Sequence, residues 1–190
     1  MSRMVIRPRL ARILLRLIRW RTQGELPQQA IVVGAPHTSN WDWVFALLFA
    51  WSQGHHPRIM VKREYFDGPL APIMRLTGAV RVDRTNPTKD IKALVAEIEA
   101  GGEFLLAVAA EGTRSKVEYW KSGFYRLSQQ TGLPITLAFM DGPTRTVGCG
   151  PTFHPTGDLK ADMDLIRDFY ADKHGVHPAK RTEPRLRNEG

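Results

Sequence analysis

The sequence is poor in cysteine and has no long uninterrupted apolar run. Its 190 residues include one cysteine, Cys149, so an intramolecular disulfide is impossible and the chain fits a reducing compartment. The stretch VGCGPT offers this thiol no neighbouring base, and we interpret it as a buried structural residue. The longest apolar runs, VFALLFAW and FLLAVAA, fall short of the roughly 18 residues that a membrane-spanning helix needs. We therefore expect no spanning segment.

Acidic residues are scarcer than basic ones. The chain has 27 Lys and Arg against 19 Asp and Glu, which gives a formal net charge of +8 and a pI of about 10.0. Such a balance indicates an anionic partner, which can be a nucleic acid, an acidic membrane surface or a phosphorylated substrate. No helix-turn-helix pattern, zinc spacing or RNP-type sequence accompanies the charge, so we do not expect a nucleic acid. Hydrophobic residues make up 43% of the chain, enough for the core of one domain.

The first 21 residues lack the continuous apolar region of a secretory signal, because arginines interrupt them throughout. They hold seven arginines and no acid. Apolar residues recur there at steps of three and four and therefore share one face of a helix: Leu10, Ile13, Leu14, Leu17 and Ile18. Arginines fall mostly on the other side: Arg9, Arg12, Arg16 and Arg19.

A basic amphipathic helix of this kind, over residues 1–22, suits an anionic membrane surface. Its apolar face enters the headgroup region while the guanidinium groups meet lipid phosphates. The alternative packs the helix on the core of the domain and leaves a solvated basic face. This segment alone does not decide between the two arrangements.

The other end of the chain, residues 174–190, is polar and basic and shows neither helical nor strand periodicity. We interpret it as a basic surface tail that follows a folded domain over residues 23–173. His174 and His177 lie in this tail without cysteine or acid partners at ligand spacing, so we expect no metal site there.

Between these ends, strand-like and helix-like segments alternate. Strands are expected at 30–35, 58–63, 79–84, 102–110, 133–141 and 144–150, and helices at 40–54, 69–78, 86–102, 121–132 and 159–173. This order predicts an α/β fold with a mostly parallel central sheet and helices on both faces. Active sites of such sheets gather at the carboxyl ends of the strands. PHTSNWD and EGTRSK both follow predicted strands, so these two polar loops should share one edge.

His37 and Asp42 lie five residues apart in the first of these loops. Ser39 or Asn40 can cap a helix that begins near Trp41, and a carboxylate in the first turn is favoured by the helix dipole. That arrangement explains Asp42 but not His37. Alternatively, Asp42 accepts a bond from one imidazole nitrogen and leaves the other as a base, as in a catalytic dyad. No Gly-x-Ser-x-Gly elbow is present, so the hydroxyl to be activated would belong to a substrate.

These motifs resemble those of the glycerophospholipid acyltransferase family, which includes the 1-acylglycerol-3-phosphate acyltransferases. His37 and Asp42 fit its His-x4-Asp motif. The remaining motifs follow in the family's order: VKREYF with Lys62 and Glu64, the stretch from Gly78 to Arg84, EGTRS at 111–115, and LPITLAF at 133–139.

The resemblance implies transfer of an acyl chain from acyl-CoA or acyl-carrier protein to a hydroxyl of a lysophospholipid, without a cofactor or a metal. His37 would be the general base and Asp42 its orienting partner. The acceptor phosphate would lie near a set of substrate-binding residues: Lys62, Arg84, Glu111, Gly112, Thr113 and Arg114. Such an enzyme would be a peripheral protein on the cytoplasmic face of an anionic membrane, and its oligomeric state is not indicated.

Two positions depart from the family pattern. Ala110 stands where a proline commonly precedes the glutamate, and Tyr65 replaces the usual leucine of the Lys-x-Glu-Leu stretch. These departures leave open an acyltransferase that uses a different lipid or a small-molecule acceptor. Two further alternatives are a non-catalytic lipid-binding protein on the same fold, and a hydrolase in which His37 activates water.

Overall fold

The computed structural model describes residues 2–61, 71–72, 77–81, 98 and 101–189. The helices expected at 69–78 and 86–102 lie largely outside these residues. The described elements follow in this order: α1 (Ser2–Leu17), β1 (Arg21–Gln23), β2 (Gln29–Ala35), α2 (Asp42–Ser52), β3 (Arg58–Val61), β4 (Ala79–Arg81), β5 (Phe104–Ala109), α5 (Gly123–Thr131), β6 (Ile135–Asp141), β7 (Thr146–Phe153), α6 (Leu159–Tyr170) and the 3-10 helix η2 (Pro178–Lys180).

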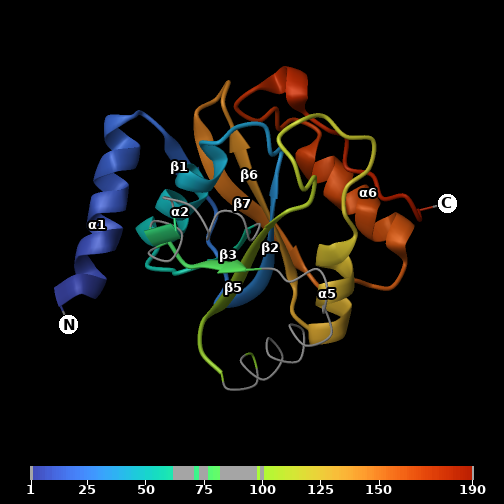
Figure 1. Cartoon of the computed structure of the whole chain (residues 1–190), viewed down its shortest axis with the longest axis horizontal. Helices are drawn as coiled ribbons and strands as arrows, with labels where there is room; N and C mark the ends of the chain where they lie inside the picture. The colour runs from blue at the N-terminus through green and yellow to red at the C-terminus, as the bar shows by residue number, and fades with distance from the viewer. Residues whose placement is uncertain (1, 62–70, 73–76, 82–97, 99–100, 190) are drawn as a thin grey trace.

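The described strands form one seven-stranded sheet in the order β1-β7-β6-β2-β5-β3-β4. The β6–β7 pair is antiparallel, and the other neighbouring pairs are parallel. Figure 1 shows α1 and α2 on one side of this sheet and α5 and α6 on the other. The predicted mostly parallel α/β fold with helices on both faces is therefore confirmed.

The buried strand β2 divides the core into two halves because its side chains alternate between the faces of the sheet. Ile31 and Val33 belong to the cluster formed with α5 and α6. Ala30 and Val32 belong to the cluster formed with α1 and α2. Both faces of β2 are thus covered, which explains why the sequence AIVVGA reads as a continuous apolar run.

The outermost strand beside β7 is β1, a three-residue strand that was not expected from the sequence. It begins at Arg21, within the segment predicted to be helical, whereas α1 ends at Leu17. Gly24, just after β1, has a φ of +75°, and a Cβ there would lie 2.2 Å from the carbonyl oxygen of Cys149. The Cys149 thiol is buried, and desolvation raises its pKa to about 11.

Helix α1 packs on α2 in an antiparallel arrangement. Trp20, after the end of α1, stacks on Phe45 with ring centroids 3.9 Å apart. At the other end of the helix, the Arg7 guanidinium lies 5.8 Å from the centroid of the Trp51 ring. The core side of α1 is formed by the buried Ala11 and Leu15.

The predicted apolar face of α1 is not the face that packs on the core. Its five residues are all exposed, and Leu17 reaches 72%: Leu10, Ile13, Leu14, Leu17 and Ile18. The arginines on the remaining side are exposed as well: Arg9, Arg12, Arg16 and Arg19. The helix is therefore attached to the domain and presents an open apolar stripe at the same time. No helix in the described part of the chain has both the length and the apolar character needed to cross a bilayer.

The C-terminal segment is attached to the folded domain by hydrogen bonds, and we call residues 174–186 the C-terminal strap. Gly175 forms a β-bridge with Asp141 at the end of β6, and Gly142 donates its N–H to the Gly175 carbonyl at 3.0 Å. Thr182 and Leu186 of the strap are buried. The interpretation of residues 174–190 as a surface tail missed this ordered packing, because backbone groups make much of it.

Candidate active site

Parallel pairing of β2 with β5 brings two polar loops to one edge of the sheet. Loop 36–41 follows β2, and loop 110–122 follows β5, with Gly34 paired to Ala109 near the ends of the two strands. The loops touch, because the backbone N–H of His37 donates to Glu111 Oε2 at 2.6 Å. Loop 110–122 and the strap lie together at the top of Figure 1. The predicted shared edge of the two loops is confirmed.

The side chains of His37 and Asp42 form a hydrogen-bonded pair. Nδ1 of His37 lies 2.8 Å from Oδ2 of Asp42. An ionised carboxylate can only accept, so the imidazole proton sits on Nδ1 and is donated to Asp42. Nε2 then keeps its lone pair, and the His37 side chain is 22% exposed. The geometry provides a base that is open to a ligand and oriented by a largely buried acid.

Asp42 also shapes the loop that carries His37. Its Oδ2 accepts from the backbone N–H groups of Thr38 at 2.8 Å and Ser39 at 2.9 Å. Helix α2 begins at Asp42, and the N-cap residue Trp41 makes no side-chain capping bond. Ser39 Oγ accepts from the Trp41 N–H at 3.1 Å. The carboxylate thus points back into the loop and serves both the structure of the loop and the orientation of His37.

Glu111 is buried beside this pair, with 1% of its surface exposed. Burial raises its pKa to about 8, and the charge of Asp42 acts in the same direction. The His37 N–H and the charge of Arg181 oppose the shift. Glu111 therefore keeps its proton at neutral pH, and its Oε1 has no hydrogen-bond partner among the described residues. This position makes Glu111 a brace between the two loops, and contact with a substrate stays a prediction.

Tyr170, the last residue of α6, fixes that helix to the carboxyl half of the sheet. Its hydroxyl lies 2.8 Å from the Val33 carbonyl of β2 and 2.9 Å from the Ala138 carbonyl of β6. Complete burial raises the pKa of Tyr170 well above its usual value of 10.0, and Glu111, which has lost its proton at the high pH where a tyrosine titrates, acts in the same direction. The hydroxyl thus stays a donor, and it holds α6 against both strands below the site.

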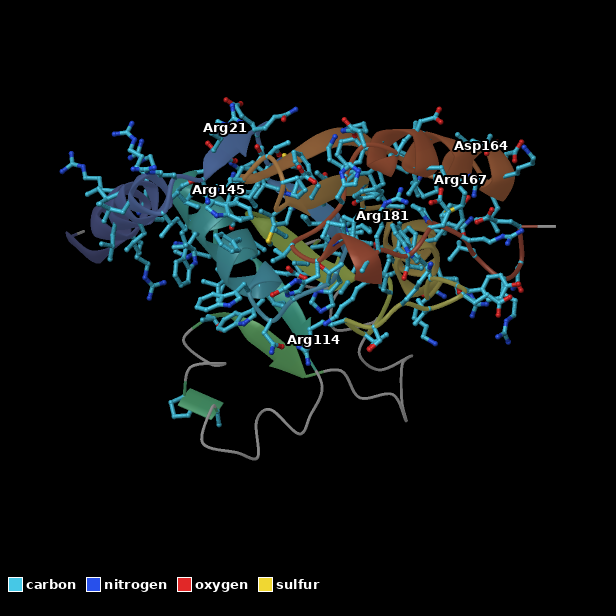
Figure 2. The ribbon with its side chains drawn as sticks, turned by 90° about the horizontal axis from the view of Figure 1, so that it is seen from above. Arg21, Arg114, Arg145, Asp164, Arg167 and Arg181 are labelled. Carbon is cyan, nitrogen blue, oxygen red and sulfur yellow. The ribbon has the colours of Figure 1, made fainter. Side chains whose placement is uncertain are left out.

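The other predicted substrate-binding residues are not buried beside the His37–Asp42 pair as Glu111 is: three of them are exposed, and two lie outside the described residues. Gly112, with a φ of +69°, allows the turn after Glu111, and Gly112, Thr113 and Arg114 are exposed. Figure 2 shows Arg114 apart from Arg181 at this edge. Lys62 and Arg84 lie outside the described residues, so their predicted position near an acceptor phosphate stays a prediction.

Sequence reasoning missed two contributors to this site, Thr38 and the C-terminal strap. Thr38 is 0% exposed, and its Oγ1 accepts from the backbone N–H of His177 at 3.0 Å. Residues such as Gly175 carry no pattern that links them to the site, since the contact is made by the backbone. In the sequence, the glycine and the prolines of the strap indicate only irregular structure.

Comparison with known protein families defines the class to which this site belongs. Residues 18–139 match the Acyltransferase family, a range that includes both loops as well as β2, α2 and β5. The chain therefore belongs to the acyltransferase family. The resemblance to glycerophospholipid acyltransferases, predicted from the motifs, is confirmed.

A solved structure with a similar fold is the crystal structure of the 1-acyl-sn-glycerophosphate (LPA) acyltransferase PlsC from Thermotoga maritima. The two chains superpose with a TM-score of 0.57 at 14% sequence identity, over 86% of this chain and 76% of the PlsC chain. At this identity the likeness concerns the fold. Comparison with curated protein sequences gives no match.

Proposed function

We propose that this acyltransferase moves an acyl chain from a thioester donor, acyl-CoA or acyl-carrier protein, to the hydroxyl of a lysophospholipid such as 1-acylglycerol-3-phosphate. The observation that carries the proposal is the His37–Asp42 pair, in which Nδ1 is bonded to the acid at 2.8 Å and Nε2 is left as the base. Family membership and the fold shared with PlsC support a lipid acceptor.

The reaction follows from this geometry. Nε2 of His37 takes the proton of the acceptor hydroxyl. The hydroxyl oxygen attacks the carbonyl carbon of the thioester at the same time, so that a C–O bond forms. The imidazolium that results is stabilised by the Asp42 carboxylate. The C–S bond then breaks, and the proton on Nε2 passes to the departing thiolate. The products are an ester and a free thiol, and His37 returns to its neutral form.

The acceptor phosphate is proposed to lie beside loop 110–122. Arg114 is exposed there, and its guanidinium fork suits a phosphate. Gly112 precedes it in a turn that adds no side chain to the loop surface. Lys62 and Arg84 are proposed as further partners of the same phosphate.

We further propose that the protein acts as a peripheral enzyme on the cytoplasmic, anionic face of a membrane. The exposed stripe of α1 would enter the headgroup region, and the exposed arginines beside it would meet lipid phosphates. Trp41 supports the same orientation, because it is 63% exposed and directly precedes Asp42. The antiparallel packing puts the Leu17 end of α1 near the beginning of α2. A lipid acceptor would thus meet the enzyme close to His37.

A thioester assay with the full chain tests the proposal. Thiol release that requires a hydroxyl acceptor, with an equal amount of acylated product, supports acyl transfer. Thiol release with an equal amount of free fatty acid would instead indicate a hydrolase, and lipid binding without turnover a non-catalytic protein. His37→Ala should abolish transfer. The matched control is His154→Ala, since His154 is exposed after β7, whose antiparallel pairing with β6 puts it at the opposite edge of the sheet.

A further inference from the structure

The C-terminal strap contacts both loops of the site. On loop 36–41, Thr38 Oγ1 accepts from the His177 N–H at 3.0 Å. Loop 110–122 in turn donates two backbone N–H groups to the strap: Val117 to Thr182 Oγ1 at 3.1 Å, and Trp120 to the Arg185 carbonyl at 2.7 Å. One continuous segment therefore contacts both the loop that carries His37 and the loop that carries Glu111 and Arg114.

Thr38 transmits this contact to the His–Asp pair. Its side chain accepts from the strap, and its own backbone N–H donates to Asp42 Oδ2 at 2.8 Å. The same Oδ2 accepts from Nδ1 of His37. A displacement of Thr38 would therefore move a donor of the carboxylate that orients the base.

Gly175 fixes the distance between the strap and this loop. Its φ is +73°, and a Cβ there would lie 2.8 Å from Thr38 Oγ1, 2.9 Å from Thr38 Cγ2 and 3.3 Å from Pro36 Cβ. No side chain fits this contact without displacing the loop. On its other side, the strap is held by β6, where Asp141 Oδ1 accepts from the His174 N–H at 2.9 Å. The strap thus lies in close contact with loop 36–41 on one side and is hydrogen-bonded to β6 on the other.

Arg181 anchors the middle of the strap to the end of α6. Its Nε donates to the Lys173 carbonyl at 2.9 Å, and its Nη2 donates to the Tyr170 carbonyl at 3.0 Å. Tyr170 is itself bonded to strands β2 and β6. The anchor of the strap and the strand that leads into loop 36–41 are therefore connected through the hydrogen bonds of Tyr170.

We propose that the C-terminal strap is a positioning element of the active site, which holds loop 36–41 in its catalytic geometry through Thr38 and Gly175. The inference deepens the proposed function, because it rests on His37 being the base. A misplacement of about 1 Å at a reacting centre can cost about a hundredfold in rate. Loosening the strap should therefore lower kcat by about ten- to a hundredfold and leave the KM of both substrates nearly unchanged.

Two pairs of variants in the full chain test the proposal. Thr38→Val keeps the shape of the side chain but removes the acceptor for the His177 N–H, while Thr38→Ser keeps the hydroxyl and is expected to restore most of the rate. Gly175→Ala pushes a methyl group against the loop. Its matched control is Gly132→Ala, because Gly132 has a φ of +70° but nothing within 4 Å of its Cβ position. Both alanines strain the backbone similarly, and one of them touches the site.

The readouts are kcat, the two KM values and amide hydrogen exchange at positions 38 and 39. Lower kcat with faster exchange in Thr38→Val and Gly175→Ala, but not in Gly132→Ala or Thr38→Ser, supports the proposal. It is overturned if folded Thr38→Val and Gly175→Ala keep the wild-type kcat, or if Gly132→Ala loses as much. If the wild-type chain transfers no acyl group, the proposed function fails. Amide hydrogen exchange at positions 38 and 39 then tests the positioning role by itself. An unchanged exchange rate in Thr38→Val and Gly175→Ala would overturn that role of the strap.

Discussion

Replacing Asp42 by asparagine removes one negative charge from the site and preserves its shape. Oδ2 accepts from His37 Nδ1, Thr38 N and Ser39 N at 2.8, 2.8 and 2.9 Å. Oδ1 is buried and has no hydrogen-bond partner among the described residues. The amide nitrogen of asparagine can take the place of Oδ1, while the amide oxygen keeps all three donors. We therefore expect Asp42→Asn to fold with loop 36–41 intact.

The missing charge matters when His37 becomes an imidazolium during proton transfer. Two unit charges about 4 Å apart interact by about 4 kcal/mol at an effective dielectric constant of about 20. At about 1.4 kcal/mol per tenfold change in rate, kcat should fall about a thousandfold. Folding loses only the dipole and charge-assisted contributions, about 1 kcal/mol, which lowers Tm by about 2–4 °C in a chain of this length.

The assay measures kcat at saturating donor and acceptor, and thermal unfolding by circular dichroism on the same samples. Asp158→Asn is the matched control, because Asp158 caps α6 by accepting from the Ala161 N–H at 3.1 Å, and asparagine caps equally well. That control should keep its rate. A folded Asp42→Asn variant whose kcat stays within about tenfold of wild type would refute the electrostatic reasoning.

Three further predictions concern the pH dependence of stability, the acceptor and the membrane. Folded Glu111 keeps its proton up to about pH 8, while the unfolded chain loses it near pH 4.5, so rising pH destabilises the wild type across this window. Between about pH 5 and pH 8, Glu111→Gln should therefore become more stable relative to wild type, by at most about 1.4 kcal/mol per pH unit. Urea unfolding at a series of pH values measures this, and a difference in unfolding free energy that stays constant with pH would contradict a protonated, buried Glu111. Arg114→Ala should raise the KM of the acceptor more than that of the donor, and equal effects in steady-state kinetics would count against a phosphate contact. Leu17→Ser should weaken co-sedimentation with acidic vesicles while Leu165→Ser, on exposed α6 surface, should not; equal loss in both would remove the stripe from lipid binding.

The strands and the His–Asp pair were predictable from the sequence because their signals are local. Buried strands such as β2 read as short apolar runs, and the alternation with helices fixes parallel pairing. Parallel pairing in turn places loops 36–41 and 110–122 at one edge before any contact is known. The five-residue spacing of His37 and Asp42 spans a single loop, so their contact needs no long-range information.

The rest of the site depends on contacts that leave no pattern in the sequence. Strap contacts such as His177 N–H to Thr38 are made by backbone atoms, which are the same for almost every residue type. The burial of Glu111 depends on packing by elements distant in the chain, whereas its sequence neighbours indicated only a polar loop. Strand β1, with the sequence RTQ, is exposed and exists because β7 offers it a pairing partner.

Because Cys149 is buried, the wild-type protein should not react with thiol-labelling reagents. A thiolate is the reactive form, and this thiol is enclosed and has a pKa of about 11, so maleimides at neutral pH should leave it unmodified. Since it is the single cysteine, a Leu17→Cys or Trp41→Cys variant would carry a fluorophore at one chosen position. Quenchers placed at known depths in a bilayer would then report how far each position enters the lipid, and hence the angle at which the enzyme meets its acceptor.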